Sequence, residues 1–388
     1  MTNAVHNIST AHLVYQTGEH NLFVGIAKPL AQVIVLTDLV PNSFYVVEVV
    51  FKGWKLQGPE RVSFRTPPTW EQSLRNPWRA ISVSCDRHSV DQNDDSFIAQ
   101  LSADTYLNYD MMFHLGDQVY GDHLEKQLET SSPNEMIEAF RDLYREAWHR
   151  QAYRPAMRHG SHLMIPDDHE LINGVSFGSG ATKKNITHHQ LFLAAGVRAI
   201  LEYERQLVSD IVPFDAAFET QSLTPMYFSF EWGRSIFLFL DLRFYQAFYN
   251  DDNAPLTGVA QLKFVKEFLT TQLNRVPPPK SLVVLSSISL LFPNHYLSLL
   301  VDAVEGDRYP LHPTKAANTA HLLNLFLQAG RSVRTTLLSG DLHLFAEEQI
   351  CKYNGTSHSC LNHMITSGLT QHSSIARYEN DTNSSIMT

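Results

Sequence analysis

The chain has 388 residues, of which 44% are hydrophobic and 18% are charged, and its formal net charge is −10. This balance is that of a folded globular protein and excludes a disordered or fibrous chain. Because no block of Lys and Arg is present to neutralise a row of phosphates, broad binding to nucleic acid or to an anionic membrane is not expected.

The N-terminal stretch MTNAVHNISTAHLVYQ lacks the basic start and the long apolar run of a signal peptide. No apolar run in the chain is long enough to span a bilayer. The sequence therefore predicts a soluble protein without a visible export signal, either cytoplasmic or exported by another route. Its compartment and its oligomeric state stay open.

Short runs rich in β-branched and aromatic residues occupy the first part of the chain, at 12–16, 22–27, 32–36, 44–51 and 61–66. Turn residues separate these runs, and the stretch TPPT at 66–69 reads as a stiff linker. We predict a small β-sandwich domain over residues 1–68 and a second domain over residues 69–388. Since no chemistry-bearing cluster precedes Arg79, we expect the first domain to pack against the second and to shape the entrance of its site.

From Arg79 onward, apolar strands alternate with amphipathic helices. Strands are expected at 80–85, 111–115, 161–165, 226–232, 235–242, 281–287, 332–340, 347–353 and 361–367, and helices at 94–104, 134–150, 188–207, 258–273 and 319–327. Many of the strands are hydrophobic throughout, as strands buried on both faces are. The pattern predicts an α/β domain with two sheets packed together and helices outside.

The three cysteines are too few, and odd in number, for a disulfide framework. Cys351 and Cys360 flank the dipeptide Asn354-Gly355, which is a turn signal. A two-residue turn at that dipeptide would place Cys360 opposite Gln349. A bridge between the two cysteines would then need a longer loop, and their pairing stays open.

Four apolar runs end in side chains that bind metals: SCDRH from Ser84, GDQVY from Gly116, DDHE from Asp167 and SGDLH from Ser339. In α/β proteins, ligands bind beyond the carboxyl ends of the strands. Strand-end aspartates also cap helices, DDHE also suits a solvated turn, and a buried cysteine is often inert. The joint occurrence favours a centre for two metal ions about 3.5–4 Å apart, the arrangement used for phosphoester hydrolysis.

These segments, in this order, resemble the alkaline phosphatase D (PhoD-like) branch of the calcineurin-like metallophosphoesterases. The similar pieces are ISVSCDRH, FHLGDQVYGD, PDDHE, FLDLR, LTGVAQLKFVKEFL, LVVLSSISL, LLSGDLHLFAEE and ITSGLTQHS. The β-rich lead-in resembles the fibronectin-like N-terminal domain of that family. The resemblance implies a metallophosphoesterase-type two-sheet sandwich flanked by helices, behind a small N-terminal β-sandwich domain.

The resemblance also implies an activity and one set of metal ligands. It implies hydrolysis of small-molecule phosphomonoesters or phosphodiesters by a metal-bridged hydroxide, with a non-catalytic binding protein of the same fold as the alternative. Asp117 corresponds to the carboxylate that bridges both metals and is one of two expected catalytic residues. Cys85, Tyr120 and His343 correspond to the remaining ligands of a ferric ion (Fe3+). Thiolate and phenolate are electron-rich donors suited to such an ion.

For the second metal, the resemblance implies Asp168 and Asp341, an oxygen-rich pair suited to Ca2+, or to Mn2+ or Mg2+. His169 corresponds to the second catalytic residue, which contacts the phosphoryl group and protonates the leaving oxygen. Arg243 is a candidate for binding substrate phosphate, with a structural pair to Asp241 as the alternative.

Three further residues stay open after this assignment. Asp86 and His88 are reserve ligands, because the wider superfamily begins with Asp-x-His. Asp122 is a further candidate for the second metal. A separate metal-binding histidine of the wider superfamily is absent here, and its place near LSSISL holds serines such as Ser287.

Overall fold

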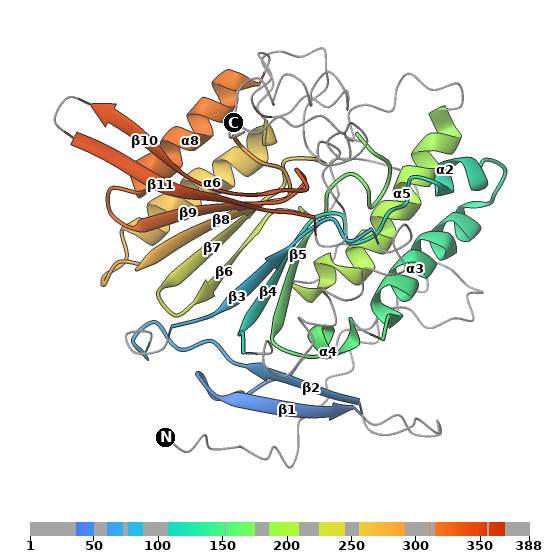
Figure 1. The fold of residues 1–388 in the computed structure, drawn as a ribbon, viewed down its shortest axis with the longest axis horizontal. Coiled ribbons are helices and arrows are strands. Elements are labelled where there is room, and N and C mark those ends of the chain that lie inside the picture. The colour runs from blue at the N-terminus through green and yellow to red at the C-terminus, as the bar shows by residue number, and fades with distance from the viewer. Residues whose placement is uncertain are drawn as a thin grey trace, which may run out of the picture.

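The computed structural model describes residues 36–49, 60–72, 77–87, 108–151, 153–174, 186–208, 225–244, 256–291, 310, 315–354 and 357–368. The strands expected at 12–16 and 22–27, nearly all of that at 32–36, and the helix expected at 94–104 lie outside these residues. The mixed α/β class predicted from the sequence is confirmed (Figure 1). None of the helices that the structure describes is long and apolar enough to cross a membrane.

Two sheets form the centre of the α/β part. The smaller sheet is parallel, in the order β3-β4-β5, with bounds β3 Ala80–Val83, β4 Met111–Leu115 and β5 Ser161–Ile165. The larger sheet has the order β10-β11-β9-β8-β7-β6, with bounds β6 Phe228–Trp232, β7 Ser235–Leu240, β8 Ser281–Ser286, β9 Arg334–Ser339, β10 Phe345–Asn354 and β11 Ser357–Thr366. Its inner strands are parallel, whereas the edge strands β6 and β10 run antiparallel to their neighbours.

Side-chain alternation along the strands separates two apolar layers. On β7, Phe237 and Phe239 face the smaller sheet, and both rings contact Phe113 of β4 at centroid distances of 5.6 and 6.0 Å. The intervening Ile236 and Leu238 belong instead to the cluster formed with helices α6 (Gly258–Leu273) and α8 (Ala316–Ala329). Successive strand residues point to opposite faces, so a strand covered on both sides has to be hydrophobic throughout.

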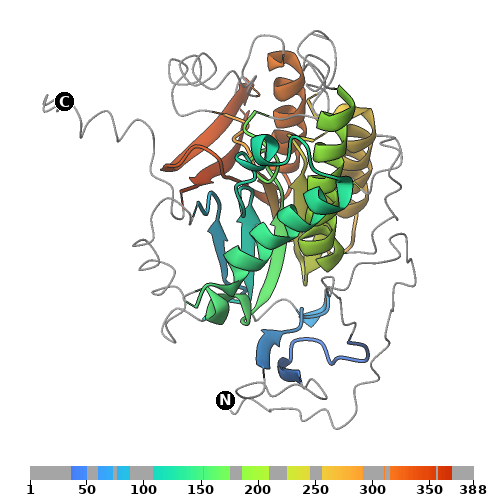
Figure 2. The same cartoon turned by 90° about the vertical axis from the view of Figure 1, so that its right-hand side faces the viewer.

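The helices pack in two groups outside the sheets (Figure 2). Their bounds are α2 Leu124–Gln127, α3 Pro133–His149, α4 Arg154–Met157, α5 Ile186–Tyr203, η3 Arg205–Leu207, α6 Gly258–Leu273 and α8 Ala316–Ala329. The predicted cap of α3 is confirmed, because Ser132 and Glu135 form a capping box before Pro133. Helices α3 and α5 pack together over Val119 and Leu171, and so anchor the loops that follow β4 and β5.

Strands β1 (Phe44–Val49) and β2 (Glu60–Arg65) form a separate antiparallel pair. Ser63 of β2 bonds to His159 through its hydroxyl at 2.8 Å, and Arg65 pairs with Asp110 at 3.1 Å. His159 and Asp110 precede β5 and β4, so the pair docks where those strands begin (Figure 1). The described strands of the N-terminal segment thus pack against the α/β part, at the strand ends opposite those that the candidate ligands follow. The prediction that the N-terminal segment shapes the site entrance stays a prediction.

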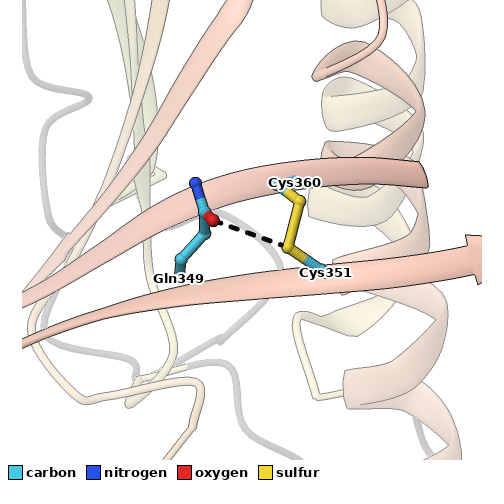
Figure 3. The surroundings of a disulfide bond; sticks show 3 residues. All are labelled: Gln349, Cys351 and Cys360. Atoms are coloured by element: carbon cyan, nitrogen blue, oxygen red, sulfur yellow. Dashed lines mark hydrogen bonds between the residues drawn. A yellow bond between two sulfur atoms is a disulfide. The ribbon is translucent and has the colours of Figure 1, made fainter.

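Cys351 and Cys360 form a disulfide across the β10–β11 hairpin, with their Cα atoms 4.2 Å apart (Figure 3). Asn354 pairs with Ser357, so the hairpin connection lies one residue later than the turn expected at Asn354-Gly355. A shift of one residue in the turn moves each cross-strand partner by two. Cys360 therefore lies opposite Cys351 rather than Gln349, and the prediction that a bridge needs a longer loop is wrong.

Candidate metal centre

Strand ends from both sheets converge at two glycines of the predicted motifs. A Cβ atom on Gly116, after β4, would lie 2.5 Å from the Cβ of Asp167 and 3.0 Å from that of Ser287. A Cβ atom on Gly340, after β9, would lie 2.5 Å from the carbonyl oxygen of Leu115. The two contacts at 2.5 Å are closer than Cβ atoms show in folded proteins, so glycine at both positions lets the ends of β4, β5, β8 and β9 meet.

The backbone is strained at the same place. Cys85, Asp117, Asp341 and His343 have φ angles of 59°, 59°, 70° and 51°. They are four of the six non-glycine residues with positive φ in the described part of the chain. The left-handed region is costly for residues with a Cβ, and it is retained mainly where a functional geometry requires it. The strain therefore marks these four residues as a functional cluster.

The candidate ligands form three overlapping groups. Within each group the ligand atoms lie within 4.8 Å of one another: Cys85, Asp117 and His343; Asp117, Asp168 and His169; Asp167, Asp168 and Asp341. Asp117 is common to the first two groups, and Asp168 to the last two. Asp167 was not among the predicted ligands, although its position as the first residue of DDHE was a signal for it. The geometry brings together the ends of all four motifs that the sequence singled out.

Three of these carboxylates, Asp117, Asp167 and Asp168, have one oxygen that accepts a hydrogen bond and one buried oxygen without a hydrogen-bond donor among the described residues. Tyr120 donates its hydroxyl to Asp117 Oδ2 at 3.2 Å, and Gly174 N donates to Asp168 Oδ2. Asp117 Oδ1 and Asp168 Oδ1 are buried and accept no hydrogen bond from any residue that the structure describes. Because buried polar atoms almost always have partners, these two oxygens fit a bound cation.

The charges at the site also favour bound cations. Burial raises the pKa of Asp117 to about 7; the charge of His169 opposes this rise, whereas Asp167 and Asp168 add to it. Burial, followed by the charges of Asp117 and Asp341, raises the pKa of the Cys85 thiol. Several buried acids close together repel one another, and a bound cation reverses that repulsion.

His343 and Cys85 share one hydrogen-bonding partner that the sequence did not indicate. The backbone N–H of His343 donates to Ser367 Oγ at 2.9 Å, and the same hydroxyl lies 3.1 Å from Cys85 Sγ. Burial and the nearby His169 lower the pKa of His343 to about 4, which keeps its imidazole in the neutral, metal-binding form. Ser367 follows β11, so its role depends on a strand that is distant from both ligands in the chain.

His169 is oriented by a carboxylate. Its Nδ1 lies 2.8 and 2.9 Å from the two oxygens of Asp122, which also accepts a hydrogen bond from Asn173 N at 2.8 Å. The Tyr120 ring lies against the imidazole at a centroid distance of 4.4 Å. Among the described residues, Asp122 belongs to no group of potential metal ligands, and its place is beside His169.

Arg243 lies among the acids of the third group. Its Nε donates to Asp167 Oδ1 at 2.5 Å, and its Nη2 lies 3.6 Å from both Asp168 Oδ1 and Asp341 Oδ1. Asp241, the expected structural partner, accepts a hydrogen bond from the Arg243 backbone N–H at 3.0 Å. Arg243 is 3% exposed, and its guanidinium neutralises part of the carboxylate charge.

The reserve ligand Asp86 is buried and forms an ion pair with Arg150. The other reserve ligand, His88, lies outside the described residues. Asp86 is therefore not joined to the ligand groups that the structure describes.

The fold and the site together define an α/β protein with a candidate two-metal centre at the carboxyl ends of both sheets. Residues 80–385 match the model of the PhoD-like phosphatase family. The chain belongs to this family, which confirms the resemblance found in the sequence. A solved structure titled "Structure of PhoD" is similar, with a TM-score of 0.63 and 17% identity. The match covers 87% of this chain but only 65% of that one, about two thirds of its length. No curated protein matches the chain.

Proposed function

We propose that the protein hydrolyses small-molecule phosphate esters, monoesters or diesters, at a two-metal centre. Asp117 carries the proposal, because its carboxylate belongs to two adjacent groups of potential ligands and keeps one buried oxygen without a donor among the described residues. In this proposal the two sheets form a metallophosphoesterase-type sandwich within a catalytic domain of residues 69–388. Strands β1 and β2 then belong to a fibronectin-like domain of residues 1–68.

The donor sets fit two different ions. We propose Cys85, Tyr120 and His343, with Asp117, for a ferric ion (Fe3+), since thiolate and phenolate stabilise it. Asp168 and Asp341, with the shared Asp117, suit a divalent ion such as Ca2+, Mn2+ or Mg2+. When bound, the two ions would lower the pKa of a water molecule and draw electron density from the phosphoryl oxygens.

His169 is proposed as the general acid for the leaving oxygen. Burial acts to lower the pKa of His169, but the charge of Asp117 and the hydrogen bond with Asp122 outweigh it and raise the pKa to about 10. Without bound metal the imidazole therefore carries a proton, and the hydrogen bond with Asp122 would favour the same form when the metals are bound. Asp122 and the Tyr120 ring fix its orientation, which general acid catalysis requires. Arg243, which already neutralises part of the carboxylate charge, is also proposed to contact the substrate phosphate.

The test uses the full chain supplied with iron and with calcium or manganese. A nitrophenyl phosphomonoester and a bis-nitrophenyl phosphodiester are assayed in parallel, while bound metal is measured on the same samples. We expect turnover of at least one ester, and loss of most activity and of at least one metal in Asp117→Asn. Folded, metal-loaded protein without turnover at any pH would favour the alternative, a non-catalytic binding protein. Retention of both metals and full activity in Asp117→Asn would overturn the bridging role.

The ferric assignment has its own readout. Ferric phenolate and thiolate centres absorb visible light, so the iron-loaded protein is expected to be coloured. Tyr120→Phe should shift or remove the phenolate band, whereas His169→Ala should keep the colour and stop turnover. A fully active preparation without iron and without visible absorption would contradict the ferric ion and leave the two-metal hydrolase standing.

A further inference from the structure

Arg87 lies beside the candidate metal centre without belonging to any of its ligand groups. It follows Cys85 by two residues, on the loop after β3. Its guanidinium carbon lies 5.3 Å from the centroid of the Tyr120 ring, on which it stacks as a cation on an aromatic face. Its charge also contributes to the low pKa of His343. Arg87 therefore places a positive charge close to two candidate ligands of the iron side.

The donors of Arg87 are not used by the part of the chain that the structure describes. Its Nε is buried and donates no hydrogen bond to any described residue, and no described carboxylate forms an ion pair with it. The two other arginines near the site differ, since Arg150 pairs with Asp86 and Arg243 with Asp167. A buried guanidinium donor without a partner is costly, unless a ligand supplies the acceptor.

The chemistry of the donor indicates the ligand. A guanidinium presents a planar fork of N–H groups that matches the oxygens of a phosphate, and such bonds are charge-assisted. A phosphomonoester dianion has three terminal oxygens and two negative charges. A phosphodiester has two terminal oxygens and one charge. A cation beside the phosphoryl group therefore contributes more to binding a monoester than to binding a diester.

We propose that Arg87 binds a terminal oxygen of the substrate phosphoryl group and directs the site toward phosphomonoesters. This inference rests on the proposed ester hydrolysis and adds the substrate class to it. Arg87 differs from Arg243, the other proposed phosphate contact, because Arg243 is already paired with a carboxylate of the third ligand group.

Three variants test the proposal in the full chain: Arg87→Ala, Arg87→Lys and the matched control Arg331→Ala, whose side chain is exposed in the turn after α8. For Arg87→Ala, kcat/KM for nitrophenyl phosphate should fall roughly 10- to 100-fold, the effect of losing a charge-assisted hydrogen bond. For the bis-nitrophenyl diester, which carries half the charge, the fall should be smaller, roughly 3- to 10-fold. Arg87→Lys keeps the charge without the fork, so an intermediate loss is expected.

Binding of inorganic phosphate gives a readout that does not depend on turnover. Calorimetry should show weaker phosphate binding in Arg87→Ala than in the wild type and in Arg331→Ala, with equal metal content in all three proteins. Equal phosphate affinity in Arg87→Ala and the wild type would overturn the contact. Equal losses for both esters would overturn the preference for monoesters. If the wild type hydrolyses neither ester, the proposed function fails, and the phosphate measurement still decides whether Arg87 binds phosphate.

Discussion

Glu170 ties together the two loops that carry most of the candidate ligands. Its side chain is fully buried, and its two oxygens accept hydrogen bonds from Gln118 N at 2.6 Å and from Asp167 N at 2.8 Å. Gln118 directly follows Asp117, and Asp167 directly precedes Asp168. One carboxylate thus sets the spacing between the loops after β4 and β5. We predict that Glu170→Gln weakens both folding and metal binding.

The expected loss of stability in Glu170→Gln follows from the number of acceptor oxygens in the side chain. Glutamine offers one acceptor oxygen, so its amide group would face one of the two backbone N–H donors. Leaving a buried N–H unsatisfied costs about 1–3 kcal/mol, and the remaining hydrogen bond loses its charge assistance, roughly another 1 kcal/mol. Burial, Glu204 and Asp117 raise the pKa of Glu170, so the neutral amide recovers part of this cost. We expect a net loss of about 1–3 kcal/mol in the free energy of unfolding.

Urea unfolding and metal content, measured on the same preparations, check this reasoning. The control is Glu267→Gln, the same chemical change at a side chain that is 66% exposed and paired with Lys263 at 3.8 Å. An exposed pair of this kind is worth less than about 0.5 kcal/mol. If Glu170→Gln matched Glu267→Gln in unfolding free energy and in bound metal, Glu170 would not be holding the loops together.

Three other predictions concern separate parts of the molecule. Asp122→Asn should lower turnover of nitrophenyl esters roughly 10- to 100-fold without changing bound metal, because His169 loses its orienting carboxylate; metal loss would point to Asp122 as a ligand. Burial lowers the pKa of His162 to about 4, so the unfolded chain takes up this proton first. The contribution of His162 to the free energy of unfolding should fall by about 1.4 kcal/mol per pH unit between about pH 6.5 and about pH 4, and urea unfolding of His162→Gln should lack this contribution. Reducing the Cys351–Cys360 disulfide, with a separation of nine residues, should cost about 2–3 kcal/mol in urea unfolding and leave the metal content unchanged; an unchanged unfolding midpoint would contradict this.

Local patterns in the sequence were sufficient for the elements and for the ligand types. The apolar run before Gly116 predicts strand β4, and Ser132 followed by Pro133 predicts the start of α3, since both depend on neighbouring residues. The order of the motifs GDxxY, DDHE and SGDxH likewise identifies the family. Each motif is only a few residues long, so it can be read from the sequence without knowledge of the fold. Periodicity assigns a side chain to one face of its strand, but it does not say which sheet lies opposite.

Contacts between residues far apart in the chain came from the packing of the two sheets. Ser367 lies between Cys85 and His343 because β11 ends beside β3, and no local pattern carries that neighbourhood. The Arg243 guanidinium lies among acids from two other strand ends for the same reason. The hairpin register also escaped prediction, since a turn shifted by one residue leaves the local composition unchanged while moving every cross-strand partner. The positions of these side chains depend on long-range packing. They are fixed only when both sheets and their glycine-containing strand ends come together.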